Sequence, residues 1–204
     1  MSELITSVMP EFGVNYKPGY SFGTFRSNSI ISYGIAWFTR RDNPGEMRCS
    51  HVGFVSEDGG TLEALQGQGV VEGNLDQYFD DPHVHIFFRK PRHYTNQLGA
   101  DICAEARKLL GKPYDKRLIA AHAAAGSLIG RVLNLMTDEA FERWLEGKMN
   151  SPDAWMCAEY TAWTMQQRPE VAGLGCLTRE SCTVNPPQYI FDSELWTPMR
   201  QVDN

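Results

Sequence analysis

The sequence predicts an α+β fold in which a small antiparallel sheet packs against helices. Strand-like patterns fill the chain up to residue 89, and apolar residues at helical spacing dominate after it. Pro91 separates the two regions. The 204 residues are enough for one domain with its own core and short for two, so we expect a single domain over residues 1–204.

Composition and charge narrow the class of protein. Hydrophobic residues make up 42% of the chain and charged residues 22%, which is ordinary for a globular protein. The net charge of -6 without a basic stripe argues against nucleic acid and anionic lipid as partners. The five cysteines are irregularly spaced and the first 20 residues show no export signal. We therefore expect reduced thiols and a cytoplasmic location, or delivery by another route such as a phage particle.

The predicted strands lie in the first half of the chain. The first 30 residues are rich in turn formers, and residues 30–39 are apolar and β-prone. Residues 50–55 have a strand pattern, residues 57–60 suit a hairpin turn, and Thr61–Leu65 should form the returning strand. Residues 83–89 alternate again and predict a further strand.

The predicted helices follow. Apolar residues at 102, 106, 109 and 110 have helical spacing, and Gly111 with Pro113 ends that helix. Two more helical patterns, 120–136 and 137–146, predict a helical insert at about 116–150. The apolar stretch 118–136 is interrupted by polar residues, so we expect no stable membrane span there. A last helix should begin near Met156 and run to Gln167.

Cys157 is the first candidate catalytic residue. It stands where a polar segment gives way to the last predicted helix. The free N–H groups and the dipole at a helix start stabilise a thiolate, which is the nucleophilic form, and the same N–H groups can bind an oxyanion. Two other interpretations stay open. A helix start at residues 151–153 would move Cys157 into the second turn, and a buried thiol on an apolar helix needs no function.

His51 and Glu63 are the expected base and orienting residue. An imidazole has a pKa suited to accept a thiol proton, and a carboxylate can hold its second ring nitrogen. The hairpin turn decides their geometry. A symmetric turn would place Gln66 opposite His51, whereas a three-residue loop or a glycine bulge would put His51 and Glu63 on one face. Gln66 is therefore the reserve orienting residue. Cys49 is a competing nucleophile, but its side chain should run parallel to that of His51.

Several short segments, in this order, resemble the permuted NlpC/P60 papain-like proteins, and most of all their YaeF/YiiX-like branch. The segments are Ser50-His51-Val52-Gly53, Glu63-Ala64, Gly111-Lys112-Pro113-Tyr114-Asp115 and Cys157-Ala158-Glu159. The resemblance implies a circularly permuted papain-like fold, with the histidine strand before the cysteine helix. It also implies that Tyr114 lies near the site and helps to shape it. Ala158 stands where that family commonly has serine.

The resulting hypothesis is a cysteine peptidase or amidase-like hydrolase with Cys157, His51 and Glu63 as catalytic residues. We expect it to cleave an amide in a peptide, a peptidoglycan fragment or a related molecule, with Tyr114 and Gln66 at the substrate and no cofactor. A lipid thioesterase or acyltransferase is one alternative, because the helix at 118–136 could line an acyl groove. A non-catalytic binding module that keeps the fold is the other. We expect no metal site, since His83 and His85 lack a further ligand at a telling spacing.

Overall fold

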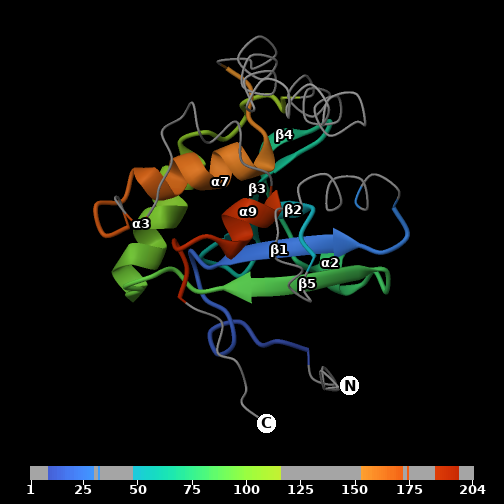
Figure 1. Ribbon diagram of the computed structural model, residues 1–204, viewed down its shortest axis with the longest axis horizontal. Helices are drawn as coiled ribbons and strands as arrows, with labels where there is room; N and C mark the ends of the chain where they lie inside the picture. The colour runs from blue at the N-terminus through green and yellow to red at the C-terminus, as the bar shows by residue number, and fades with distance from the viewer. Residues whose placement is uncertain are drawn as a thin grey trace, which may run out of the picture.

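The computed structural model describes residues 9–29, 32, 48–115, 153–171, 174 and 187–197. The elements in chain order are β1 Ser21–Arg26, β2 His51–Val55, β3 Thr61–Leu65, β4 Gly69–Gly73, α2 Asp76–Phe79, β5 Val84–Arg89, α3 Asn96–Arg107, α7 Cys157–Gln166 and α9 Pro187–Asp192. The strands form one antiparallel sheet in the order β4-β3-β2-β1-β5 (Figure 1). The predicted α+β class with an antiparallel sheet is confirmed. The expected insert at 116–150 and nearly all of the β-prone stretch 30–39 lie outside the described residues.

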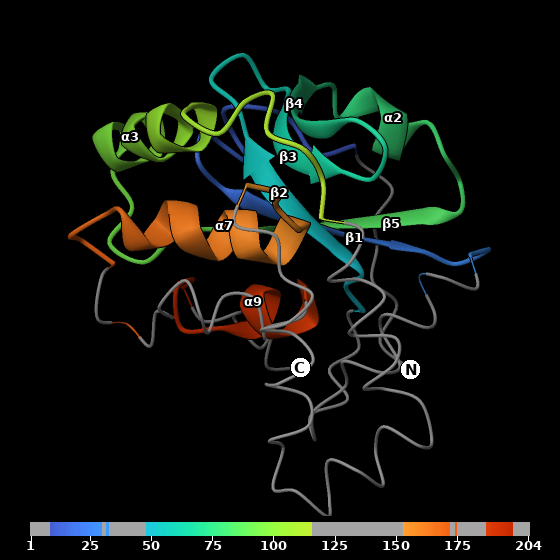
Figure 2. The same ribbon diagram turned by 90° about the horizontal axis from the view of Figure 1, so that it is seen from above.

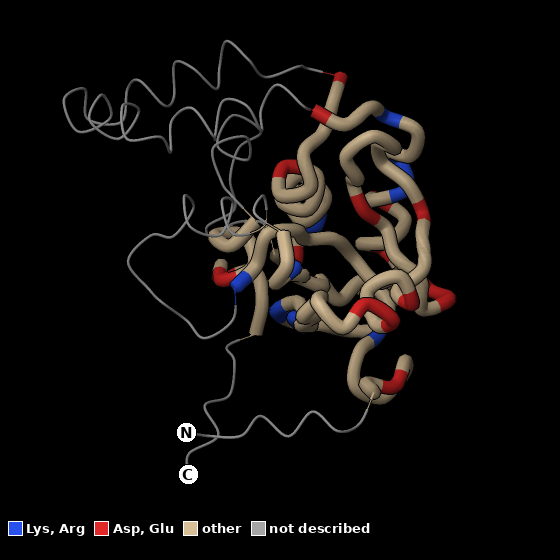
Figure 3. Tube along the Cα trace, turned by 90° about the vertical axis from the view of Figure 1, so that its right-hand side faces the viewer, with Lys and Arg blue, Asp and Glu red and all other residues tan. Residues whose placement is uncertain are grey.

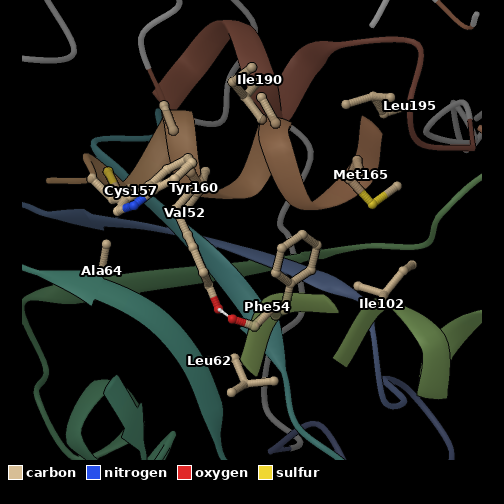
Figure 4. Packing of buried hydrophobic residues seen from close by; sticks show 14 of the residues in the cluster. Val52, Phe54, Leu62, Ala64, Ile102, Cys157, Tyr160, Met165, Ile190 and Leu195 are labelled. Atoms are coloured by element: carbon tan, nitrogen blue, oxygen red, sulfur yellow. Dashed lines mark hydrogen bonds between the residues drawn. The ribbon is translucent and has the colours of Figure 1, made fainter. Parts of the chain in front are cut away.

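The sheet separates two apolar clusters because successive side chains of a strand point to opposite faces. The larger cluster joins β2 and β3 to α3, α7 and α9, and α7 lies between the other two helices (Figure 2). Figure 4 shows its centre, where Val52, Phe54, Leu62 and Ala64 face α7. The smaller cluster, on the opposite face, contains Tyr16, Phe22, Val55, Leu75 and Tyr78.

The turn between β2 and β3 settles the register that the sequence left open. The N–H of Ser56 donates to Gly60 O at 3.0 Å, so residues 57–59 form a three-residue loop. Gly59 has φ +86, a conformation that suits glycine. Phe54 pairs with Leu62 and Val55 with Thr61. Continuing this register places Glu63 opposite Gly53, on the same face as His51, so the symmetric turn is excluded.

Several elements differ from the sequence prediction. β1, which lies between β2 and β5, occupies part of a region that the composition marked as turn-rich. Its Gly23 permits close packing under α9, since a Cβ there would lie 2.7 Å from a ring carbon of Phe191. Three further elements were not predicted from the sequence. They are β4, which begins and ends with glycine, α2, which has only 4 residues, and α9, which begins at Pro187. All of these elements depend on tertiary contacts more than on local pattern.

Ion pairs tie the elements together at the surface. Arg107 on α3 binds Glu57 of the hairpin loop and Glu72 of β4, each at 2.6 Å. Arg168, after α7, binds Asp101 of α3 at 2.8 Å. Figure 3 shows Lys and Arg interspersed with Asp and Glu along the described part of the chain, rather than gathered in one stripe.

Within the described ranges, no helix has the length and apolar character needed to cross a membrane. The stretch 118–136 lies outside those ranges.

Candidate active site

Helix α7 begins at Cys157, and Met156 precedes it in an extended conformation with φ -88 and ψ 155. The helix cannot start earlier because the segment before it pairs with another part of the chain. The N–H of Trp155 donates to Pro113 O at 2.9 Å, and the N–H of Asp115 donates to Trp155 O at 3.2 Å. The alternative placement of Cys157 in a second turn is therefore wrong. Its N–H lies among the first groups of the helix, which have no intrahelical acceptor.

His51 and Glu63 are in direct contact. Nε2 of His51 lies 2.6 Å from Oε2 of Glu63, which confirms the expected hydrogen bond. Gly53 makes this contact possible from its place opposite Glu63. A Cβ on Gly53 would lie 2.7 Å from the Phe22 ring and 3.0 Å from the Glu63 Cβ. Any side chain at this position would push Phe22 or Glu63 away from His51.

The Glu63 carboxylate is fully buried, and donors surround it. Oε2 accepts hydrogen bonds from His51 Nε2 and from the Tyr78 hydroxyl. Oε1 accepts from Thr61 Oγ1 at 2.6 Å and from Gln77 Nε2 at 3.2 Å. Burial opposes the charge of Glu63, but these hydrogen bonds and the charge of His51 outweigh it and lower the pKa of the carboxyl group. Glu63 is therefore an anion at neutral pH.

His51 also forms a hydrogen bond with Cys157, and each group shifts the pKa of the other toward its charged form. Burial alone would lower the pKa of His51, but hydrogen bonds to Cys157 and Glu63 and their negative charges raise it to about 10. Burial would likewise raise the pKa of Cys157, but His51 and the backbone N–H groups of Val52 and Ala158 lower it. Because Nε2 of His51 binds Glu63, Nδ1 is the ring nitrogen left for Cys157. The arrangement favours a thiolate and an imidazolium at neutral pH.

Tyr114 is the second predicted residue that the structure brings to Cys157. It is half-buried, and the pairing of residue 114 with Trp155 holds it beside the start of α7. Burial, the negative charge of Cys157 and a hydrogen bond to its sulfur raise the pKa of the Tyr114 hydroxyl, which therefore stays a neutral donor.

Gln66 is exposed in the turn after β3, and the register leaves Leu65, not Gln66, opposite His51. Its reserve role as orienting residue is thus wrong, while its role at a substrate stays a prediction.

The other described cysteines lack this activation. Cys49 is buried, and its thiol donates to the backbone oxygen of His51 at 3.1 Å. Burial and the nearby charge of Cys157 raise its pKa well above the usual range. Cys103 is also buried, its thiol donates to Val55 O at 3.3 Å, and burial raises its pKa to about 12. Cys176 and Cys182 lie outside the described residues.

We expect Cys157 to be the thiol that iodoacetamide alkylates first in the folded protein near neutral pH. The reason is its lowered pKa, set against the raised pKa values of Cys49 and Cys103. Time-resolved alkylation with peptide mapping by mass spectrometry ranks all five thiols, and the unfolded protein serves as the control for intrinsic reactivity. If Cys49 or Cys103 is alkylated ahead of Cys157, the nucleophile is wrongly assigned.

Three residues that bind Glu63 were missed from the sequence. Thr61 is two residues from Glu63 on one strand face, so the period of a strand would have found it. Gln77 and Tyr78 lie 14 and 15 residues after Glu63 and belong to no motif. The only signal for them is the general requirement that a buried carboxylate be supplied with donors.

The comparisons with known proteins found no relative of this chain. No protein-family model, curated protein or solved structure matches this chain. Within the described residues, no group of three His, Cys, Asp or Glu side chains is arranged to hold a metal ion. His83 and His85 are both exposed near the sheet edge formed by β5.

Proposed function

We propose that this chain is a cysteine hydrolase that cleaves an amide bond through an acyl-enzyme on Cys157, within a circularly permuted papain-like fold. One observation carries the proposal: an unbroken line of hydrogen bonds runs from the thiol of Cys157 through His51 to the buried carboxylate of Glu63. The order of the chain supports the fold, because the strand that carries the histidine precedes the helix that carries the cysteine. A nucleophile, a proton carrier and an orienting anion together make a catalytic triad.

In the proposed reaction, the Cys157 thiolate attacks the amide carbonyl carbon. A C–S bond forms, and the π electron pair moves to the carbonyl oxygen. The N–H groups in the first turn of α7 and the Tyr114 hydroxyl are the candidate donors to that oxyanion. The His51 imidazolium gives its proton to the nitrogen, the C–N bond breaks, and the amine leaves a thioester on Cys157. Neutral His51 then takes a proton from water, whose oxygen attacks the thioester and releases the acid and the thiolate.

A protonated His51 meets the requirement that an amide substrate sets for its leaving group. An amine is a poor leaving group unless it is protonated, so an amidase needs a general acid before the C–N bond breaks. With a pKa of about 10, His51 carries that proton at neutral pH. The acyltransferase alternative depends on a groove at residues 118–136, outside the described residues. The described part of the chain therefore supplies what amide hydrolysis requires.

A turnover panel tests this proposal. Purified protein is incubated with peptide anilides, muropeptides, an acyl thioester and a phospholipid, and the products are identified by mass spectrometry. We expect cleavage of an amide that is lost in Cys157→Ser and kept in Cys103→Ala, which removes a buried thiol remote from His51. Turnover of the lipid or thioester alone would favour the acyltransferase alternative. Binding without turnover would favour the non-catalytic module.

Glu63→Gln should lower kcat by about 10- to 100-fold, because glutamine keeps an acceptor for His51 but supplies no charge. It should also lower the free energy of unfolding by about 1–3 kcal/mol, since one amide NH2 would face groups that now donate to a carboxylate. Steady-state kinetics and chemical unfolding measure the two effects. The matched control is Glu72→Gln, an exposed residue of β4. A loss in Glu63→Gln as large as that in His51→Ala would contradict a purely orienting role.

A further inference from the structure

The short helix α2 places two side chains against the carboxylate of Glu63. The Tyr78 hydroxyl donates to Oε2, the same oxygen that accepts from His51. Gln77 donates to Oε1 at 3.2 Å. Gly73 of β4 leaves room beside this oxygen, because a Cβ there would lie only 2.7 Å from Thr61 Oγ1, the other donor to Glu63 Oε1. The carboxylate is thus held from both sides, by its own sheet and by α2.

Packing fixes the position of the Tyr78 hydroxyl. The side chain is buried, and its ring centroid lies 5.5 Å from that of Phe22 and 6.2 Å from that of His51. Burial and the charge of Glu63 raise the pKa of Tyr78, so the phenol stays neutral and donates. At the start of α2, the N–H of Asp76 donates to Asn74 Oδ1 at 3.0 Å. After the helix, Asp81 forms an ion pair with Arg26 of β1.

We propose that α2 is the positioning element of this site: Tyr78, with a smaller contribution from Gln77, fixes Glu63 so that Glu63 holds His51 toward Cys157. This inference rests on the proposed function and adds the positioning residues that the reaction depends on. Tyr78 shares an oxygen with His51, so its hydroxyl sets where that oxygen lies. A donor to Glu63 also favours the carboxylate anion, the anion favours the imidazolium, and the imidazolium favours the Cys157 thiolate.

The titratable groups around Cys157, His51 and Glu63 come from several elements. Besides Glu63 and Tyr78 they are Arg26 of β1, Cys49 before β2, His51 of β2, Tyr114, and Cys157 and Tyr160 of α7. The tyrosines are neutral, because burial raises the pKa of each of them. The charge that Tyr78 controls is therefore that of Glu63, and its effect reaches Cys157 through His51.

Tyr78→Phe tests the proposal, because it keeps the ring and removes only the hydroxyl. Glu63 loses a donor and its pKa rises, so the Cys157 thiolate loses stabilisation and its pKa rises as well. We expect the pH curve of Cys157 alkylation by iodoacetamide to move to higher pH, and kcat to fall about tenfold with KM unchanged. Tyr16→Phe is the matched control, since Tyr16 is a buried tyrosine of the same cluster without a hydrogen bond to Glu63 in the described structure. Gln77→Met should move the curve the same way by a smaller amount.

The outcomes separate this inference from the proposed function. If Glu63→Gln moves the alkylation curve but Tyr78→Phe and Gln77→Met both leave it in place, α2 has no positioning role. If no acyl substrate is turned over but Tyr78→Phe still moves the curve, the proposed function fails and the positioning role stands. Thermal unfolding of each variant identifies a loss of fold. Should Tyr78→Phe fail to fold, the curve of Gln77→Met decides.

Discussion

Cys157→Ala should abolish amide hydrolysis and leave the fold intact. Removal of a nucleophile that works as a unit with its base lowers kcat by several orders of magnitude, on the order of 10⁴- to 10⁶-fold. Alanine is well tolerated at the first turn of a helix, and the change removes only a sulfur atom. Product formation is measured by mass spectrometry, and the fold by circular dichroism and thermal unfolding.

The control for Cys157→Ala is Cys103→Ala. Both thiols are buried, but Cys103 donates to Val55 O and makes no contact with His51 in the described structure. Cys103→Ala should cost about 1–3 kcal/mol of stability at most and keep kcat near the wild-type value. Wild-type turnover in Cys157→Ala would move the assignment to a non-catalytic binding module.

The second large effect is expected for His51→Ala, with a fall in kcat on the order of 10⁴-fold. Two losses combine: the thiolate loses its imidazolium partner, and the leaving amine loses its general acid. Added imidazole should restore part of the rate, because the substitution empties a ring-sized space between Cys157 and Glu63. Initial rates with and without imidazole measure both effects.

His83→Ala is the matched control, since His83 is exposed and precedes β5. It should keep the full rate and show no response to imidazole. His51→Ala also leaves the buried Glu63 without its cationic partner, so unfolding must be followed in parallel. A folded His51→Ala variant with wild-type kcat would exclude His51 as the proton carrier.

The hairpin of β2 and β3 could be predicted from the sequence, and its register could not. The strand patterns predict strands at residues 50–55 and 61–65, and in the structure β2 covers His51–Val55 and β3 covers Thr61–Leu65. Whether Glu63 or Gln66 faces His51 depends on whether the loop of the hairpin is one residue longer or shorter. The glycines at 59 and 60 are compatible with both the symmetric turn and the three-residue loop. The structure decides this through the hydrogen bond between Ser56 and Gly60.

The start of the last helix shows the same division between local and tertiary information. The sequence places its beginning near Met156, yet residues 151–153 offer an equally good local start. The pairing of Trp155 with residues 113 and 115 excludes that start. It joins positions 42 and 40 residues apart, a contact that no local pattern encodes. Tyr78 was missed for the same reason, because its contact with Glu63 is a tertiary one between residues 15 apart in the sequence.

The proposed mechanism requires that Cys157 becomes acylated during turnover. Rapid acid quench of the wild-type protein with an activated amide or ester, followed by intact-mass analysis and peptide mapping, tests it most directly. We expect one acyl group per chain, attached to the peptide that contains Cys157 and discharged by hydroxylamine. The adduct should be absent in Cys157→Ala and present in Cys103→Ala. An acyl group found on another residue, or turnover without any adduct on Cys157, would exclude Cys157 as the nucleophile.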